Sequence, residues 1–134
     1  MTLPVPLEHD EQRRLFQWAA CQRVTYPDLQ WLYAIPNGGK RSKATAGKLK
    51  AEGVKPGVPD VALDVARGGW FGLRLELKRR KKSHVSDVQE AWHRRLWAQG
   101  YKVEVCYGWE QASVALIRYL ALPPTRVADD TVAA

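Results

Sequence analysis

The sequence is poor in residues that build disulfide frameworks and metal clusters. Its 134 residues include two cysteines, Cys21 and Cys106, and three histidines, His9, His84 and His93. Neither set has the spacing of metal ligands, and two isolated cysteines are typical of reduced thiols in a cytosolic protein. We therefore expect a cytoplasmic protein without disulfide bonds and without a cysteine or histidine metal cluster.

Long apolar runs and a phosphate-binding loop are also missing. No stretch approaches the length of a membrane span, and residues 1–10 lack the basic-then-apolar order of a signal peptide. Gly38-Gly39-Lys40 contains the lysine of a phosphate loop, but Ala34 occupies the position of the first glycine and Arg41 follows the lysine. We therefore expect no membrane association and no nucleotide cofactor.

Acidic residues are outnumbered, and the excess of positive charge is concentrated in two blocks. The net charge is +7. Residues 37–59 hold six lysines or arginines against one acid, and residues 74–95 hold eight against three. A solvated charged face is the simpler interpretation of either block alone. Two blocks that flank a pair of acids favour a surface that follows phosphates.

The pair of acids is Asp60, which directly follows the first block, and Glu76, near the start of the second block. Asp60 follows the turn Gly57-Val58-Pro59 at the start of an apolar run, and Glu76 lies in residues 73–78, where apolar and polar residues alternate as in a strand. Glu76 and Lys78 would project from the same face of that strand. If the two segments pair as an antiparallel hairpin, Asp60 comes alongside Glu76. Two carboxylates and an ammonium group suit a divalent metal and a phosphodiester.

Hydrophobic periodicity and turn residues predict a single α/β domain. We expect helices over residues 8–24, 43–52, 86–99 and 109–120, and strands over residues 31–35, 61–65, 70–79 and 102–107. This order suits a mixed central β-sheet flanked by helices. Residues 1–122 would form the domain, and residues 123–134 a disordered C-terminal tail.

Several motifs occur in one order along the chain. They are residues 8–12, 35–39, 53–60, 74–78 and 86–89, the last of which opens a helix. With this arrangement the sequence resembles the VRR-NUC domain family of the PD-(D/E)xK nuclease superfamily over residues 8–121. The resemblance implies a restriction-endonuclease-like core and a stand-alone member of the phage or bacterial type, in the cytoplasm of a bacterial or phage-infected cell.

The resemblance and the chemistry of the side chains together give a metal site. Asp60 and Glu76 are the expected ligands of Mg²⁺ or Mn²⁺, and the backbone carbonyl of Leu77 is a candidate third ligand. Lys78 would orient the attacking water or stabilise the charge that builds on the phosphate in the transition state, and it could also act as a base. The alternative interpretation is that Asp60 is an ordinary turn residue at the start of a strand and that Glu76 is an ordinary surface residue of a strand.

Further site residues come from two helices and from the basic blocks. Gln89 is a satisfied core amide or, by the resemblance, an active-site residue. The acid of the first helix is Glu8 or Glu11, with a slight preference for Glu8. The expected contacts to DNA are Asn37, Lys40, Arg41, Lys43, Lys48, Arg79 and Arg80.

The expected function is that of a metal-dependent, structure-selective DNA endonuclease similar to a Holliday-junction resolvase. A nuclease for flaps or other branched DNA is the first alternative, and an inactive basic DNA-binding module with the same fold is the second. Symmetric cleavage of a four-way junction needs two sites, so we expect a homodimer. Candidate interface residues are Trp70, Phe71 and Trp97, for which core packing is an equal alternative.

Overall fold

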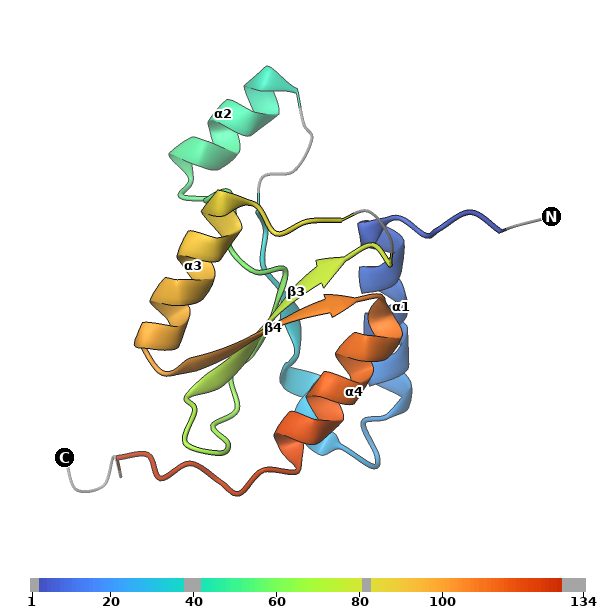
Figure 1. The fold of residues 1–134 in the computed structure, drawn as a ribbon, viewed down its shortest axis with the longest axis vertical. Coiled ribbons are helices and arrows are strands. Elements are labelled where there is room, and N and C mark those ends of the chain that lie inside the picture. Colours follow the sequence, from blue (N-terminus) through green and yellow to red (C-terminus); the bar gives the residue numbers. More distant parts are fainter. Residues whose placement is uncertain (1–2, 38–41, 81–82, 129–134) are drawn as a thin grey trace.

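The computed structural model describes residues 3–37, 42–80 and 83–128. Its elements are, in chain order, α1 (Glu8–Cys21), the 3₁₀ helix η1 (Pro27–Trp31), β1 (Tyr33–Ala34), α2 (Lys43–Ala51), β2 (Val61–Leu63), β3 (Gly72–Lys78), α3 (Asp87–Ala98), β4 (Tyr101–Tyr107) and α4 (Trp109–Leu120). Four strands form one sheet with helices around it, so the predicted α/β fold is confirmed (Figure 1). None of the helices in the described ranges is long and apolar enough to cross a membrane.

The sheet has the strand order β1-β2-β3-β4 and is mixed. The strand β2 runs antiparallel to β3, with Val61 opposite Leu75, as the predicted hairpin requires. The strand β4 runs parallel to β3 after the crossover through α3, with Glu76 opposite Val105. The strand β3 is therefore central, and both of its edges are paired.

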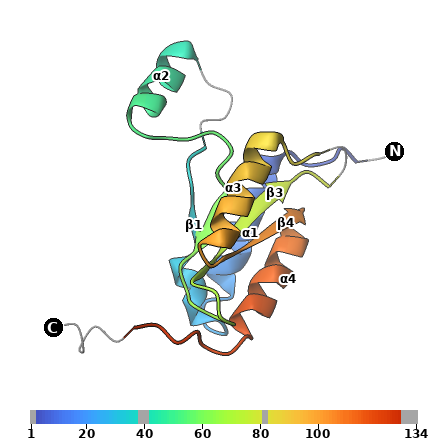
Figure 2. The same ribbon diagram turned by 60° about the vertical axis from the view of Figure 1, so that its left-hand side comes forward.

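The two faces of β3 meet different surroundings. Leu73, Leu75 and Leu77 belong to the apolar core, which also contains Leu15 of α1 and Leu116 of α4. Alternate residues of a strand point to opposite faces. The intervening polar residues of β3 consequently face the other layer, which is α3. Figures 1 and 2 show α1 and α4 together on one side of the strands and α3 on the other.

The first strand is shorter than the sequence predicted. Residues 31–35 were expected to be a strand, but Trp31 ends the 3₁₀ helix η1 and only Tyr33 and Ala34 pair with β2. Pro27 stands at the first turn of η1, where its missing N–H costs nothing. The predicted strand was wrong at this end because a proline-initiated turn continues through Trp31.

The segment after α4 crosses the turn between β2 and β3. The backbone N–H of Gly68 donates to the carbonyl of Pro123 at 2.7 Å, and that of Thr125 donates to the carbonyl of Ala66 at 3.2 Å. The Thr125 hydroxyl donates to the carbonyl of Trp70 at 2.7 Å. Residues 123–125, which the sequence assigned to the tail, are thus held against this turn. Residues 129–134 lie outside the described ranges.

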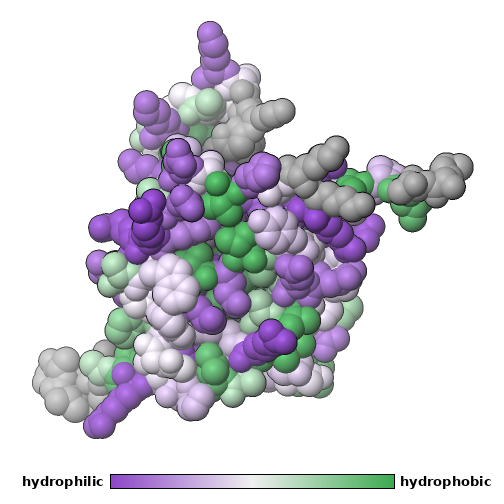
Figure 3. All heavy atoms as spheres, viewed as in Figure 1, coloured by the Kyte–Doolittle hydropathy of each residue, from purple (hydrophilic) through white to green (hydrophobic). Residues whose placement is uncertain are grey.

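Helix α2 buries none of its residues, as is also true of α3, but α2 does not cover the sheet. Ser42 caps it, since the N–H of Thr45 donates to the Ser42 hydroxyl at 3.2 Å, and Gly53 follows its end with a positive φ of 92°. Figures 1 and 2 show α2 standing apart from the helices that cover the sheet. Hydrophilic side chains cover this part of the surface at the top of Figure 3.

Candidate active site

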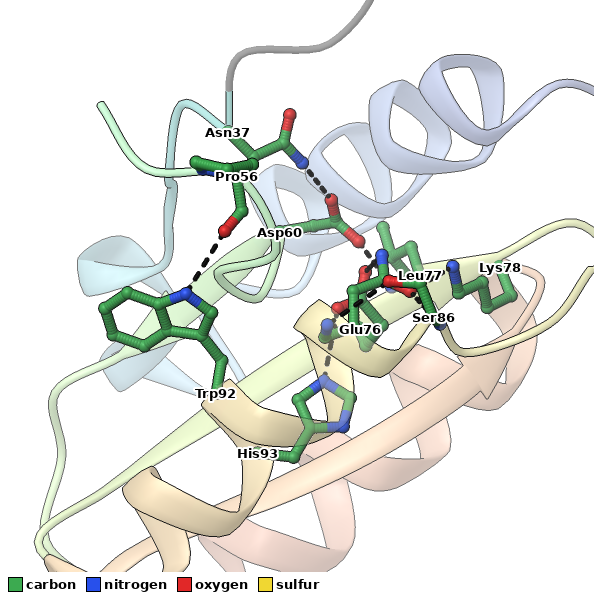
Figure 4. A network of polar contacts seen from close by, with 10 residues as sticks. Asn37, Pro56, Asp60, Glu76, Leu77, Lys78, Ser86, Trp92 and His93 are labelled. Carbon is green, nitrogen blue, oxygen red and sulfur yellow. Dashed lines mark hydrogen bonds and ion pairs between the residues drawn. The ribbon is translucent and has the colours of Figure 1, made fainter. Parts of the chain in front are cut away.

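Asp60 is positioned by the sheet itself. It directly precedes β2, and its backbone N–H donates to the carbonyl of Leu75 at 3.0 Å. Its carboxylate accepts a hydrogen bond from the Leu77 N–H at 2.7 Å and another from the Asn37 side-chain amide at 2.9 Å (Figure 4). Both carboxylate oxygens of Asp60 are therefore held at the edge of β3 that faces β2.

The carbonyl of Leu77 lies at the same edge. In a strand the N–H and C=O groups of one residue point to the same side, because paired residues exchange both hydrogen bonds. The Leu77 N–H points to Asp60. The carbonyl that was predicted as a third oxygen ligand consequently faces the side on which the Asp60 carboxylate lies.

A glycine allows the turn before Asp60 to approach α3. Gly57 has a φ of 86°, and a Cβ atom at this position would lie 2.3 Å from Cγ1 of Val88. The same turn is bound to α3 by a hydrogen bond, in which the indole N–H of Trp92 donates to the carbonyl of Pro56 at 3.1 Å. The turn and the first turns of α3 are thus packed directly against each other, which brings α3 over the polar face of β3.

Glu76 is almost fully buried, with 1% of its surface exposed. Its carboxyl group contacts the side-chain amide of Gln89 and the Nε2 atom of His93, each at 3.2 Å. Burial, followed by a hydrogen bond with Asp60 and the negative charge of Asp60, raises the pKa of Glu76 to about 9, and the positive charge of Lys78 opposes this shift. A hydrogen bond between two carboxyl groups requires a proton, so the pair holds one proton near neutral pH.

Gln89 joins Lys78 to Glu76 and also starts the helix. Its side-chain carbonyl accepts hydrogen bonds from the Lys78 ammonium at 2.8 Å and from the Ser86 N–H at 2.9 Å. Its amide donates to Glu76. Ser86 and Gln89 form the capping box of α3, as expected for a Ser86 N-cap. The predicted site residue Gln89 therefore lies with Glu76 and Lys78.

Glu8 and Glu11, the two candidate acids of α1, lie in different places. Burial raises the pKa of Glu8, and the nearby charges that act on it include Lys78 and Asp60. Glu8 also contributes to the raised pKa of Glu76. It therefore faces the carboxylate pair from α1.

Glu11 instead serves the start of α4. It is fully buried, and its carboxylate accepts the N–H of Trp109 at 2.8 Å and lies 3.6 Å from the guanidinium of Arg80. The residue before α4 is Gly108, which has no side chain to cap the helix, and a Cβ there would lie 2.9 Å from the Glu11 carboxylate. A carboxylate at a helix N-terminus satisfies a free N–H and the helix dipole. The structure thus places Glu11 at the start of α4, with partners that Glu8 does not share.

Three of the side chains predicted to contact DNA have partners within the chain. The guanidinium of Arg79 donates to the carbonyls of Val5 and Pro6. Arg80 pairs with Glu110 at 3.0 Å as well as with Glu11, and Asn37 binds Asp60. Lys43 and Lys48 are exposed on α2. Lys40 and Arg41 lie outside the described residues.

His93 was missed by the sequence reasoning. It follows Gln89 by four residues, which places both on one face of α3. Burial and the positive charge of Lys78 lower the pKa of His93, so its imidazole is neutral near pH 7. The four-residue spacing from Gln89 was the signal in the sequence that could have identified His93. The histidines were considered only as a possible metal cluster, and His93 belongs to none.

The oxygen donors of this site fit a hard divalent cation. Among the described residues, no three His, Cys, Asp or Glu side chains are grouped as metal ligands. Asp60 and Glu76 supply two carboxyl groups, and the Leu77 carbonyl faces the same edge. Mg²⁺ commonly binds through one or two carboxylates and keeps several waters.

The chain was compared with known proteins. A family model described as the VRR-NUC domain matches residues 8–110. A solved structure described as "VRR_NUC domain protein" is 27% identical in sequence and superposes with a TM-score of 0.77, covering 92% of this chain and 96% of the other. No curated protein matches.

Proposed function

Since this chain belongs to the VRR-NUC domain family, whose members are nucleases of the PD-(D/E)xK type, we propose that it is a metal-dependent, structure-selective DNA endonuclease. It hydrolyses phosphodiester bonds in branched DNA in the manner of a Holliday-junction resolvase. The observation that carries this proposal is the carboxyl pair of half-buried Asp60 and buried Glu76 beside the ammonium group of Lys78.

Asp60, Glu76 and the carbonyl of Leu77 would hold Mg²⁺ or Mn²⁺. The bound metal supplies charge neutralisation at the phosphate and lowers the pKa of the attacking water. The pair must lose its shared proton before it can bind the metal. Because Leu77 and Asn37 hold both Asp60 oxygens, the first ligand is fixed in advance.

Lys78 and Gln89 act together beside this metal site. Lys78 is 6% exposed and its ammonium group is held by Gln89 at 2.8 Å, so its charge is fixed where negative charge would develop on the phosphate. Gln89 orients Glu76 and Lys78 at once. Glu8 completes the site from α1, where it faces the pair and Lys78.

The basic surface of α2 would bind the DNA backbone. Lys43 and Lys48 are exposed on this helix and form no ion pair among the described residues. Unpaired ammonium groups on a projecting helix suit phosphate contacts, which provide affinity without sequence preference. Arg79 and Arg80, with partners inside the chain, are better suited to holding the end of β3.

We also propose that two copies act together, because one chain carries one carboxyl pair and symmetric junction cleavage needs two. An exposed aromatic cluster is available for the contact. Phe71 is 53% exposed, and Trp70 and Trp97 pack edge to face with ring centroids 4.7 Å apart. Sedimentation equilibrium at micromolar concentration tests this proposal, since a monomer that still makes paired cuts would contradict it.

The test of function compares substrates and metals in one assay. Purified protein is incubated with a fixed four-way junction, a flap and a linear duplex of the same sequence, each with Mg²⁺, Mn²⁺ or EDTA. We expect metal-dependent cleavage of the junction and no cleavage in EDTA. Preferential cleavage of the flap would favour the alternative of a flap nuclease. Binding without cleavage in any metal would favour the inactive DNA-binding module.

A further inference from the structure

A groove lies between α2 and the turn that leads to Asp60. Its volume is about 450 Å³, which falls in the range of small-molecule sites, about 300–1,000 Å³. The wall from α2 includes Ala46 and Leu49, and the opposite wall includes Val54 and Pro56. Aliphatic side chains thus contribute to both walls of the groove, although α2 itself buries no residue.

The groove adjoins the carboxyl pair. Asn37 lines it, and the amide of Asn37 binds the Asp60 carboxylate at 2.9 Å. On the opposite wall, the carbonyl of Pro56 is bound by the indole of Trp92 on α3. Figure 4 shows Asn37 and Pro56 on the same side of Asp60. A ligand in the groove would therefore lie directly beside a phosphodiester held at the carboxyl pair.

Two lysines supply the charge of this groove. Lys50 and Lys55 line it, are exposed, and form no ion pair among the described residues. Among the described residues, no acidic side chain contributes to the lining. Aliphatic lining residues next to ammonium groups are complementary to a nucleotide. The flat face of its base is apolar, and its phosphate is negatively charged.

We propose that this groove, which we call the α2 groove, binds one unpaired nucleotide next to the scissile phosphate. The proposal rests on the proposed nuclease function and makes it more specific. A paired base is stacked inside the duplex and cannot enter, whereas an unpaired base costs little to turn out. Selectivity for branched DNA then arises because the junction supplies an unpaired or easily unpaired nucleotide at this position.

The matched variants are Ala46→Phe and Ala44→Phe. Both alanines are exposed on α2, but only Ala46 lines the groove, so the first substitution fills it and the second does not. Neither position is buried, so we expect unchanged thermal unfolding for both variants. The probe is 2-aminopurine, a fluorescent adenine analogue, placed singly at successive positions around the branch of a splayed-arm DNA in EDTA, with DNA binding followed separately by anisotropy.

In the wild-type protein, we expect brighter fluorescence at one unpaired position, because a base that enters an aliphatic groove leaves its stacked neighbours. Ala46→Phe should lose this signal and reduce the preference for splayed-arm DNA over duplex by roughly tenfold, as expected for losing the contacts of one base. Ala44→Phe should retain both. Equal brightening in Ala46→Phe, or DNA binding without brightening at any position, would overturn the α2 groove. Absence of DNA binding would instead overturn the proposed function on which it rests.

Discussion

The carboxyl pair and helix α2 differ in burial, because Glu76 is buried and Asp60 half-buried, whereas α2 is exposed. Glu76 is 1% exposed and has hydrogen-bonded contacts with α3, whereas α2 buries none of its residues. Asn37 connects the two regions through its bond to Asp60 and its place in the α2 groove. The difference teaches that reacting groups require fixed geometry, while groups that meet a long charged substrate require exposure and freedom from internal partners.

The largest effect is expected from Glu76→Gln, which attacks the buried side of this comparison. Loss of the carboxylate should reduce cleavage on the order of 10³-fold, because charge stabilisation at the phosphate is lost. DNA affinity in EDTA should stay unchanged, since α2 is untouched. Single-turnover cleavage and anisotropy measure the two quantities. Glu104→Gln on β4 is the control, and cleavage by Glu76→Gln at the wild-type rate would sink the site.

The next effect separates the two acids of α1. Glu8→Gln should reduce cleavage by roughly tenfold or more without changing the free energy of unfolding. Glu11→Ala should lower the free energy of unfolding by about 1–3 kcal/mol, because the buried N–H of Trp109 loses its acceptor. Denaturant unfolding and cleavage are measured for both variants. An unchanged unfolding free energy in Glu11→Ala would contradict the assignment of Glu11 to the start of α4.

The proton of the carboxyl pair gives a pH dependence of stability. The pKa of Glu76 is raised to about 9 in the folded protein, so the folded state holds a proton that the unfolded state has released. Stability from this proton is full below the unfolded pKa and is lost as pH rises towards about 9. Without metal, the free energy of unfolding should fall by up to about 1.4 kcal/mol per pH unit between about pH 7 and about pH 8.5.

The shifted pKa values of His93 and Cys106 lie outside the range from about pH 7 to about pH 8.5. The pKa of His93 is lowered from its usual value, and burial raises the pKa of Cys106 to about 12. Denaturant unfolding of wild type and Glu76→Gln at several pH values is the measurement. The variant should lack the slope, and equal slopes in the two proteins would show that the pair is not the source.

The smallest effect concerns α2. Lys48→Gln should reduce the slope of log K against log salt by about 0.9, the value for one phosphate contact on duplex DNA. Arg118→Gln, which removes the same charge from the exposed side of α4, should leave the slope unchanged. Anisotropy titrations at several salt concentrations decide between the two outcomes. Identical slopes for both variants and wild type would place the phosphate contacts away from Lys48.

The hairpin and its acids could be predicted from the sequence because each depends on local pattern. Alternation in β3 placed Glu76 and Lys78 on one face, and the Ser86 N-cap began α3 where it was expected. These features follow from neighbours in the chain. The prediction of Gln89 as a site residue depended on the family resemblance as well, because a glutamine on a helix face can also be a structural residue.

The partners of charged residues could not be predicted. Arg79 and Arg80 were assigned to DNA because the sequence shows a run of positive charge, but it does not show that backbone carbonyls and Glu110 meet them. Asn37 and Glu11 likewise find partners that are distant in sequence. Tertiary contacts decide which basic groups are left for a substrate.

We propose that Asp60 and Glu76 exchange a shared proton for a divalent cation. Calorimetric titration with Mn²⁺ at about pH 7, in two buffers of different ionisation enthalpy, measures metal binding and proton release together. Wild type should bind the metal and release a proton, whereas Glu76→Gln should bind far more weakly and without proton release. Equal binding by the wild-type and Glu76→Gln proteins would contradict the account.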